Sequence, residues 1–510
     1  MSTPETSPGK SFVRLGNRRT ARLDALPQHG IDVLRAALRG AVNDGWRIVT
    51  LFGTPESDSA LRIVAIVADD ERGQLGAATA RVGERYPAIA AECPQAALFE
   101  CEMAEQCGVV PEGHPSLRSL RRHAPDHRPA AWSPTSPPLD DTLPRTPFRG
   151  DEVHEVAVGP VHAGIIEPGH FRFQAHGEEV LSLDISLGYQ HRGVESLLET
   201  LDGPRAVYVA ESIVGDTVIA HANAYCGALE ALSRCHKSAR AQNIRGIALE
   251  LERLANHVGD LGAMSGDVAY QPAAAYFGRL RGECLNMLMT ISGNRYGRGL
   301  VRPGGVAFDI TPEMADELRR RTTRLEAELR PVADLFFGAA SVQSRLEGVG
   351  VVKHDACIEH GFVGPVARAA EVHRDVRHDH PYGVYRYAQI PVATAWAGDV
   401  YARALIRWVE IRRSLEFVAE QLATLPRGEV RVPCGAFAAG ELVVAIEEGW
   451  RGEVVHAVLT DDHGKVRRHK VTDPSFRNWP ALAMAMPGNQ ISDFPLCNKS
   501  FNLSYAGHDL

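Results

Sequence analysis

Hydrophobic residues recur at helical spacing in the second half of the chain. One such series is Ile244, Ile247, Ala248, Leu251, Leu254, Ala255, Val258 and Leu261. This is the period of an amphipathic helix that buries one face. Thr311-Pro312 predicts the start of another helix, with threonine as the N-cap and proline at the first helical position, ending near Phe337. Asp399 to Leu422 predicts a third long helix.

Strand patterns occur nearer the N-terminus. Two β-rich runs, Trp46 to Phe52 and Leu61 to Asp69, flank a polar turn and predict a hairpin. Phe171 to Ile185 alternates apolar and polar residues on both sides of a turn, which predicts a second hairpin with one buried face. The segment from Arg72 to Arg81 predicts the start of a helical region.

These elements predict an α+β protein with two domains. Residues 1–123 form an N-terminal α/β domain, and residues 124–150 form a linker because the segment is rich in proline and has no periodicity. Residues 151–510 form a mainly α-helical domain with peripheral β-hairpins. A chain of 510 residues is long enough for two or three domains with sizeable cores.

Composition excludes several classes of function. The net charge of −8 argues against nucleic acid as a partner, since phosphate binding needs a basic face. No apolar run reaches the ~18 residues that span a bilayer. The N-terminus lacks the apolar core of a secretory signal, so we expect a cytoplasmic chain. The nine cysteines include no C-x-x-C pair, which argues against an iron–sulfur cluster or zinc ribbon in this chain.

One motif organises the rest of the chain. Arg192, Gly193 and Glu195 give R-G-x-E, and sixteen residues later the chain reads Ser-Ile-Val-Gly-Asp-Thr, residues 212–217. This register resembles the large subunit of nickel–iron hydrogenases, whose pattern is R-G-x-E, sixteen residues, then R-x-C-G-x-C. The two cysteine positions are Val214 and Thr217 here. A second ligand pair, expected near the C-terminus as D-P-C-x-x-C, falls on Ser504 and Gly507.

The missing thiolates predict a chain without a metal centre of its own. Nickel and low-spin iron need soft, anionic sulfur ligands. Valine has no donor atom, glycine has no side chain, and serine and threonine hydroxyls are hard and seldom ionised. We therefore expect no nickel–iron centre at these four positions.

Other blocks extend the resemblance over most of the chain. Gly159 to His162 reads G-P-x-H, Leu187 to Gly193 reads L-G-Y-x-H-R-G, and Arg374 to Tyr385 contains a P-Y-x-x-Y block. These are typical of the same large subunits. Phe99 to Leu120 is similar to a block of the small complex I subunit that is often fused to the large one. The whole resembles the fused large subunits of group 4, membrane-bound hydrogenases of the formate hydrogenlyase and hydrogenase-4 type.

The resemblance also implies a site. In the related large subunits of complex I, the vacated cavity accepts a quinone, and His162, Tyr189 and His191 are candidates for its contacts here, with ordinary packing or surface positions as the alternative. A proton relay or cavity lining is implied by Glu195, Arg192, Asp216 and His221, with Asp509 nearby. Glu195 could instead form a buried ion pair with an arginine such as Arg192, and His221 could be a satisfied core histidine.

The predicted function is that of a core subunit of a membrane-associated, complex-I-like or hydrogenase-4-like oxidoreductase. It would lie on the inner face of the cytoplasmic membrane and bind a small iron–sulfur subunit and antiporter-like membrane subunits. Electrons arriving from the iron–sulfur cluster of that partner would drive quinone reduction or proton translocation. Two alternatives stay open: a non-redox scaffold of such a complex, and a hydrogenase with unusual ligands.

Overall fold

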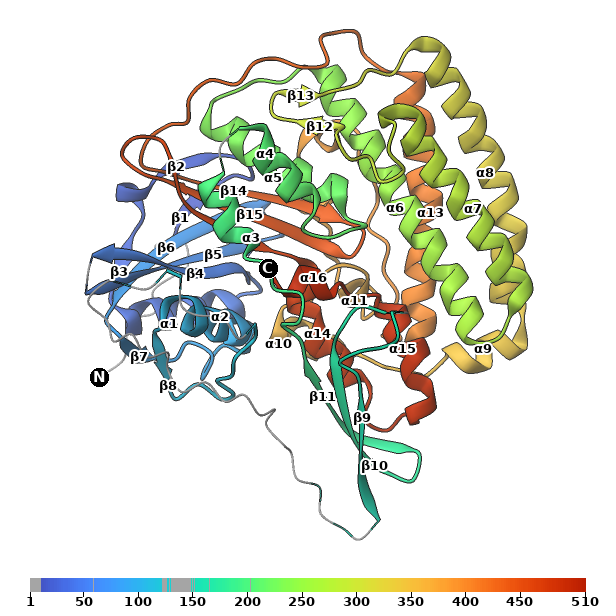
Figure 1. Cartoon of the computed structure of the whole chain (residues 1–510), viewed down its shortest axis with the longest axis horizontal. Coiled ribbons are helices and arrows are strands. Elements are labelled where there is room, and N and C mark those ends of the chain that lie inside the picture. Colours follow the sequence, from blue (N-terminus) through green and yellow to red (C-terminus); the bar gives the residue numbers. More distant parts are fainter. Residues whose placement is uncertain are drawn as a thin grey trace.

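The computed structural model describes residues 11–57, 59–121, 126–127, 129, 148, 150, 152–164, 166–201 and 203–510. The predicted linker, residues 124–150, lies almost entirely outside this part of the chain. The described residues form a mixed α+β fold, as the sequence predicts. Figure 1 shows the N-terminal strands on one side, long helices on the other, and strands from the C-terminal third between them.

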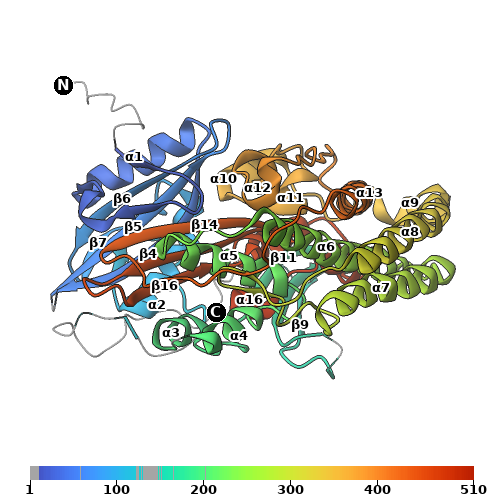
Figure 2. The same cartoon turned by 90° about the horizontal axis from the view of Figure 1, so that it is seen from above.

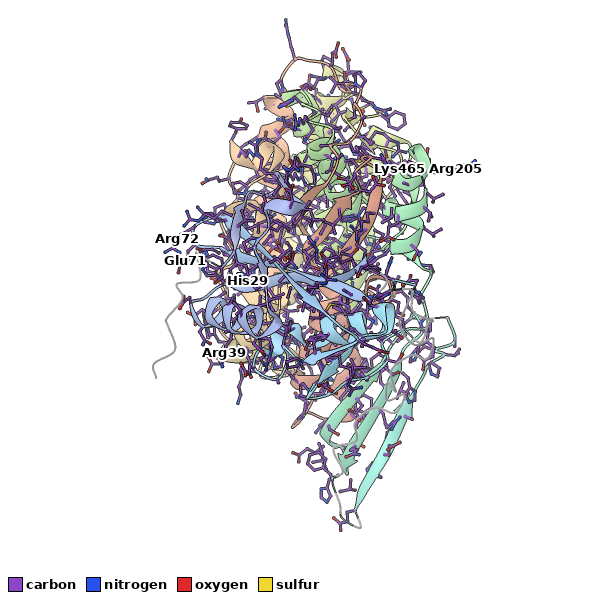
Figure 3. All side chains as sticks on the ribbon, turned by 90° about the vertical axis from the view of Figure 1, so that its left-hand side faces the viewer. His29, Arg39, Glu71, Arg72, Arg205 and Lys465 are labelled. Carbon is purple, nitrogen blue, oxygen red and sulfur yellow. The ribbon has the colours of Figure 1, made fainter. Side chains whose placement is uncertain are left out.

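The N-terminal unit is built on a mostly antiparallel sheet. Its strands are β1 (Val13–Leu15), β3 (Gln28–His29), β4 (Arg47–Ser57), β5 (Ala60–Asp69) and β6 (Gln74–Val82), joined in the order β1-β6-β5-β4 with β3 also on β6. The predicted hairpin is confirmed as β4 and β5. Helix α1 (Ile31–Asn43) packs on β4 and β6, and helix α2 (Ala97–Cys107) packs on β4. In Figure 3, where this unit faces the viewer, the labelled side chains of His29, Arg39, Glu71 and Arg72 belong to it.

The helix predicted from Arg72 to Arg81 is wrong, because this segment is strand β6. Alanine favours helices, but here Ala77, Ala78 and Ala80 are fully buried in a strand that pairs with β5 on one side and β1 on the other. Small side chains fit a strand that is covered on both faces. Pairing with neighbouring strands outweighs the local preference of these residues.

Long helices form a bundle at the other end of the molecule (Figure 1). They are α6 (Ala239–Asp267), α7 (Gln271–Ser292), α8 (Pro312–Gly338) and α13 (Val400–Ala423). Helix α6 packs on α7 and α13, and α8 packs on both of these as well. Three predicted helices are confirmed as α6, α8 and α13. Thr311 is the N-cap of α8, where its side chain accepts a hydrogen bond from the Met314 N–H group.

A buried sheet joins the two ends of the molecule. It consists of β2 (Thr20–Arg22), β14 (Glu441–Gly449), β15 (Gly452–Thr460) and β16 (Val466–Thr472), in the order β16-β15-β14-β2. Every residue of β14 and β15 is buried. Figure 2 shows these strands between the N-terminal sheet and helix α5 (Val218–Leu232). Since β2 comes from the first predicted domain, the two predicted domains share one sheet; their boundaries stay a prediction.

The second predicted hairpin is confirmed at the periphery of the molecule. Strands β9 (Val153–Val158), β10 (His170–His176) and β11 (Glu179–Ser186) form a sheet in the order β11-β10-β9. Phe171 is fully buried, and its ring lies 4.9 Å from that of Phe494 and 6.2 Å from that of Trp479. The inward face of the hairpin therefore packs on the C-terminal helices.

The remaining short elements connect these parts. The short strands are β7 (Arg85–Pro87), β8 (Val110–Glu112), β12 (Val301–Arg302) and β13 (Gly305–Val306). The short helices are α3 (Val194–Thr200), α4 (Pro204–Glu211), α9 (Ala340–Leu346), α10 (His354–His360), α11 (Gly364–Arg368), α12 (Val376–Asp379), α14 (Pro474–Ala485), α15 (Phe494–Phe501) and α16 (Tyr505–His508). Among the helices of the described residues, none is both long enough and apolar enough to cross a membrane.

Candidate functional site

Two distant parts of the chain meet at the candidate site. The loop of residues 212–217 joins α4 to α5, and its carbonyl groups at Ser212 and Ile213 accept hydrogen bonds from the Arg192 guanidinium at 3.0 and 2.8 Å. The C-terminal tail returns to the same region, where the Asp509 carboxylate accepts hydrogen bonds from the N–H groups of Gly188 and Gln190 at 2.8 and 2.9 Å. The motif residues therefore hold the loop and the tail together.

The Asp473 carboxylate lies beside Gly507, one of the four positions expected for metal ligands. A Cβ atom placed on Gly507 would lie 2.6 Å from Asp473 Cγ and 3.0 Å from Val214 Cγ2. Ser504 caps α16 by accepting a hydrogen bond from the Gly507 N–H group at 2.9 Å. Asp473 is fully buried and caps α14 through the N–H group of Ser475 at 2.8 Å. The space beside Gly507 is thus filled by a carboxylate.

Thr217 adjoins a buried arginine. Arg451 donates hydrogen bonds to Thr217 Oγ1 at 3.0 Å and to the two Asp216 carboxylate oxygens at 2.6 and 3.0 Å. Its guanidinium carbon lies 3.8 Å from the centre of the Trp450 ring. Asp216 is therefore one half of an ion pair that holds the loop against the turn between β14 and β15.

Comparisons with known proteins identify the family. The family described as "Respiratory-chain NADH dehydrogenase, 49 Kd subunit" matches residues 267–436 and 433–509. The chain is 31% identical to the carbon monoxide-induced hydrogenase of Rhodospirillum rubrum over 351 residues, which cover 68% of this chain and 97% of that protein. This chain belongs to the group 4 hydrogenase-like large-subunit family.

Two further relatives represent both branches of the family. Formate hydrogenlyase subunit 5 of Escherichia coli is 29% identical over 485 residues, which cover 91% of this large subunit and 85% of that protein. An NADH-quinone oxidoreductase subunit of Bacteroides thetaiotaomicron is 27% identical over 446 residues, which cover 80% of this chain and 83% of that protein. Both alignments therefore extend beyond the half of this chain that contains the long helices.

The residues of this large subunit do not fit a nickel–iron centre. The four expected ligand positions, Val214, Thr217, Ser504 and Gly507, offer at most two neutral hydroxyl groups. A side chain at position 507 would overlap Asp473. Among the described residues, no group of three or more His, Cys, Asp or Glu side chains is arranged to hold a metal ion. The donor set is therefore wrong in chemical type as well as in position.

A chain of buried histidines leads away from Asp473. His221 Nε2 lies 3.0 Å from Asp473 Oδ2, and His221 Nδ1 lies 3.2 Å from His456 Nε2. His456 Nδ1 in turn lies 2.9 Å from His469 Nε2. These four side chains are fully buried. Of these four side chains, the sequence predicted only His221, either as part of a relay or as a core histidine.

The Asp473 carboxylate fixes the direction of the hydrogen bonds along the three histidines, because it can only accept. A neutral imidazole has one donor nitrogen and one acceptor nitrogen. If Asp473 accepts from His221, then His221 accepts from His456, and His456 accepts from His469. Within the described residues, His469 Nδ1 has no hydrogen-bond partner. The His469 ring is stacked on Tyr225 at 5.5 Å, and Tyr225 lines a cavity of about 330 Å³.

The two histidines farther from Asp473 are neutral. Burial, together with the neighbouring His469 and His221, holds the pKa of His456 well below its usual range. Burial lowers the pKa of His469 to about 3. Burial raises the pKa of Asp473, but the hydrogen bond and charge of His221, the hydrogen bond from Ser475 and the charge of Arg451 together outweigh burial, and the net pKa is lowered. The arrangement is a hydrogen-bonded chain of histidines that ends on a carboxylate.

Glu195 lies in an ion-pair cluster, and its partners differ from the arginine that the sequence suggested. Its carboxylate is 2.8 Å from Lys470 Nζ and 3.0 Å from Arg468 Nη2, and it also accepts a hydrogen bond from Gln106 Nε2 at 3.0 Å. Burial alone would raise the pKa of Glu195, but Lys470 and Arg468 hold it well below its usual range. Arg192 bonds to the loop instead. This geometry favours the ion pair over a relay role for Glu195.

The three candidate quinone contacts lie in different environments. His162 Nε2 lies 2.7 Å from the Gly169 carbonyl oxygen and packs near Phe171. Tyr189 is 42% exposed, and His191 is partly buried in the same turn. Their common role in a quinone pocket stays a prediction.

Several functional candidates were missed from the sequence. They are Asp473, Arg451, His456, His469 and Glu252. Glu252 accepts hydrogen bonds from the N–H groups of Ile219 and Ala220 at the start of α5, and burial raises its pKa to about 8. His456 and His469 stand in two β-rich runs that flank Asp461-Asp462-His463-Gly464. Recognising this hairpin would have placed both histidines in one buried sheet.

Proposed function

We propose that this chain is the core large subunit of a membrane-associated oxidoreductase complex and has no nickel–iron centre of its own. The observation that carries the proposal is the vacated ligand site, where Val214 approaches Gly507, Asp473 lies beside Gly507, and Arg451 is bonded to Thr217. The names of the relatives, which include a formate hydrogenlyase and an NADH-quinone oxidoreductase, support an assembly with membrane subunits. The chain would lie peripherally on the inner face of the membrane.

In this proposal, electrons come from the iron–sulfur cluster of a small partner subunit. Quinone reduction consumes two electrons and two protons. Protons would enter at His469 Nδ1 and move along His456 and His221 to Asp473, each imidazole accepting a proton on one nitrogen and releasing one from the other. Asp473 lies next to the vacated position Gly507, so its carboxylate would receive the proton from His221 and pass it on to the electron acceptor. Arg451 would balance negative charge at the same place.

Affinity purification from detergent-solubilised membranes tests the assembly. We expect the tagged chain to bring along an iron–sulfur subunit and polytopic membrane subunits, identified by mass spectrometry, and the complex to reduce a soluble quinone. A chain that stays alone in the soluble fraction would contradict the proposal. An assembled complex without oxidoreductase activity would support the scaffold alternative instead.

A further inference from the structure

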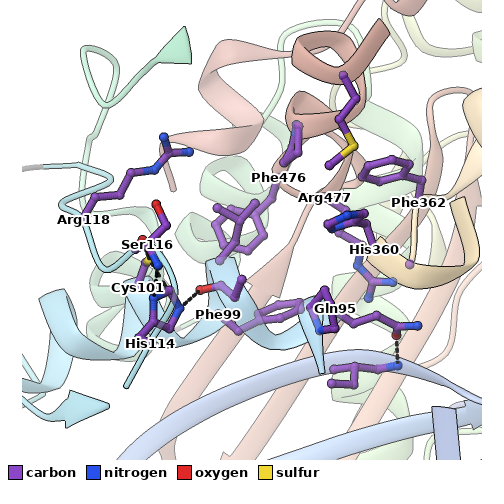
Figure 4. A pocket seen from close by; sticks show the side chains of 17 residues that line it. Gln95, Phe99, Cys101, His114, Ser116, Arg118, His360, Phe362, Phe476 and Arg477 are labelled. Atoms are coloured by element: carbon purple, nitrogen blue, oxygen red, sulfur yellow. Dashed lines mark hydrogen bonds between the residues drawn. The ribbon is translucent and has the colours of Figure 1, made fainter. Parts of the chain in front are cut away.

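A second cavity lies where the N-terminal unit meets α14, away from the vacated ligand site. Its walls come from α2 and the turn before it, from residues 114–118, from the loop after α10, and from α14 (Figure 4). Its volume is about 300 Å³, at the lower end of the range for small-molecule sites. Phe99, Phe362 and Phe476 give it apolar walls, with the rings of Phe99 and Phe476 5.3 Å apart.

The polar groups of this junction cavity are cationic or neutral. Arg118, Arg477, His114 and His360 line it, and none of its described lining residues is Asp or Glu. His114 is already bonded to the Ala97 carbonyl oxygen at 3.1 Å, and the His360 ring is stacked on Phe362. Arg477 is the buried cation of the set, with 5% of its surface exposed. The lining therefore favours a ligand that carries negative charge.

Arg477 has hydrogen-bonding capacity to spare. One of its terminal nitrogens, Nη2, donates to the Val49 carbonyl oxygen and lies 3.3 Å from Glu453 Oε1. In the part of the chain that the structure describes, its Nε and Nη1 atoms are buried without a partner. Buried N–H groups of a charged side chain are costly when no acceptor is present. Arg477 therefore brings to the cavity wall a positive charge that its partners in the protein satisfy only in part.

The ion-pair cluster behind Arg477 carries an excess of positive charge. Arg47 is bonded to both Glu453 and Asp70, at 2.6 and 2.9 Å, and Arg374 is bonded to Asp70 at 2.6 Å. The cluster thus contains three guanidinium groups, including that of Arg477, and two carboxylates. Burial lowers the pKa of Arg477 to about 10, so this side chain is still charged at neutral pH. A bound anion would balance the cluster.

An adjoining cavity gives room for an extended apolar group. It has a volume of about 370 Å³ and is lined by α14 and by residues 182–187 of β11 and the turn after it. The two cavities share Leu98, Arg118, Pro480 and Met484. An apolar chain could therefore start beside Arg477 and continue past Met484.

From this geometry we propose that the junction cavity binds a carboxylate with an apolar body, such as a medium-chain fatty acid. The carboxylate lies near the positive charges of Arg118 and Arg477, and the apolar body lies among the three phenylalanine rings and extends along Leu98 and Met484. The site bridges the N-terminal unit and α14, so occupancy would stabilise their contact. This inference does not depend on the proposed redox function, because the two sites share no residue.

Calorimetric titration of the full-length chain with decanoate and with 1-decanol tests the site. Decanoate should bind more tightly than decanol, because only decanoate presents an anion to Arg477. Arg477→Gln should weaken decanoate binding about tenfold or more and leave decanol binding unchanged. Met484→Trp, which fills the shared part of the two cavities without touching the ion-pair cluster, should weaken binding of both ligands.

The control is a substitution outside both cavities. Leu335→Trp changes another exposed apolar residue, on α8, and should leave binding unchanged. If Arg477→Gln does not fold, the preference of the unmodified chain for decanoate and the Met484→Trp variant still decide the question. Equal affinity for decanol and decanoate, absence of decanoate binding, or decanoate binding that Met484→Trp leaves unchanged would each overturn the proposal.

Discussion

Asp473 takes the space that a side chain at position 507 would need. Its carboxylate is hydrogen-bonded to His221 on one side and to the Ser475 N–H group on the other, so a displacement would break these hydrogen bonds. Gly507→Ala should therefore lower the free energy of unfolding by about 1–3 kcal/mol, measured by denaturant unfolding. Gly215→Ala is the matched control, because a Cβ atom there meets no other atom within 4 Å. Equal losses in both variants would contradict this account of the site.

A second prediction at the residue scale concerns pH. Burial lowers the pKa of His469 to about 3, below the value of about 6.5 for an unfolded histidine. Between these values the unfolded chain binds a proton that the folded chain does not, so stability falls as the pH falls through this window. His469→Phe removes this contribution. We expect the stability of the variant to fall less steeply below about pH 6.5, by up to about 1.4 kcal/mol per pH unit.

Unfolding measured at several pH values checks this slope. His463→Phe is the control, because His463 lies exposed in the turn between β15 and β16. Identical slopes for the unmodified chain and His469→Phe would show that His469 is protonated in the folded state.

At the scale of elements, the hairpin of β15 and β16 and helix α5 carry the proposed proton path. His456 is its middle member, so His456→Leu interrupts both hydrogen bonds at once. We expect turnover of the purified complex to fall about tenfold or more, normalised to the amount of assembled complex. His463→Leu, a change of the same kind in the connecting turn, should leave turnover unchanged. Full activity of the His456 variant would exclude this path.

The elements also show which features a sequence can reveal. The helical period around Leu254 and the cap at Thr311 are local signals, and both predictions are confirmed. Strand β6 was missed because its alanines take their conformation from two neighbouring strands. His456 and His469 meet through the pairing of β15 with β16, and His221 reaches them from α5. Such contacts depend on register and packing, which no local pattern contains.

At the scale of the whole molecule, buried ion pairs join the N-terminal unit to the rest. Lys470 on β16 is bonded to Glu102 of α2 at 2.6 Å and to Glu195 of α3 at 2.8 Å. Lys470→Met would leave two buried carboxylates with less positive charge nearby, and we expect a loss of about 3–5 kcal/mol in the free energy of unfolding. Lys465→Met, at a labelled surface position in Figure 3, should change stability little. Similar stability of both variants would contradict this role of Lys470.

The family could be predicted from the sequence because its motif keeps its register around Arg192 and Glu195. The residues that occupy the vacated site could not be predicted, because Asp473 and Arg451 are more than two hundred residues from the loop of residues 212–217 and meet it only in the fold. The ion-pair partners of Glu195 were missed for the same reason: Arg468 and Lys470 lie on β16. The site is defined by tertiary contacts among residues that the motif does not include.

The central claim is that a large subunit of this family works here without nickel. Its most direct test is elemental analysis of the complex purified from its native membranes, with the nickel content expressed per copy of this chain. The account predicts nickel at background level in an assembled complex. Stoichiometric nickel that stays with this chain through purification would contradict it and would support a hydrogenase with unusual ligands.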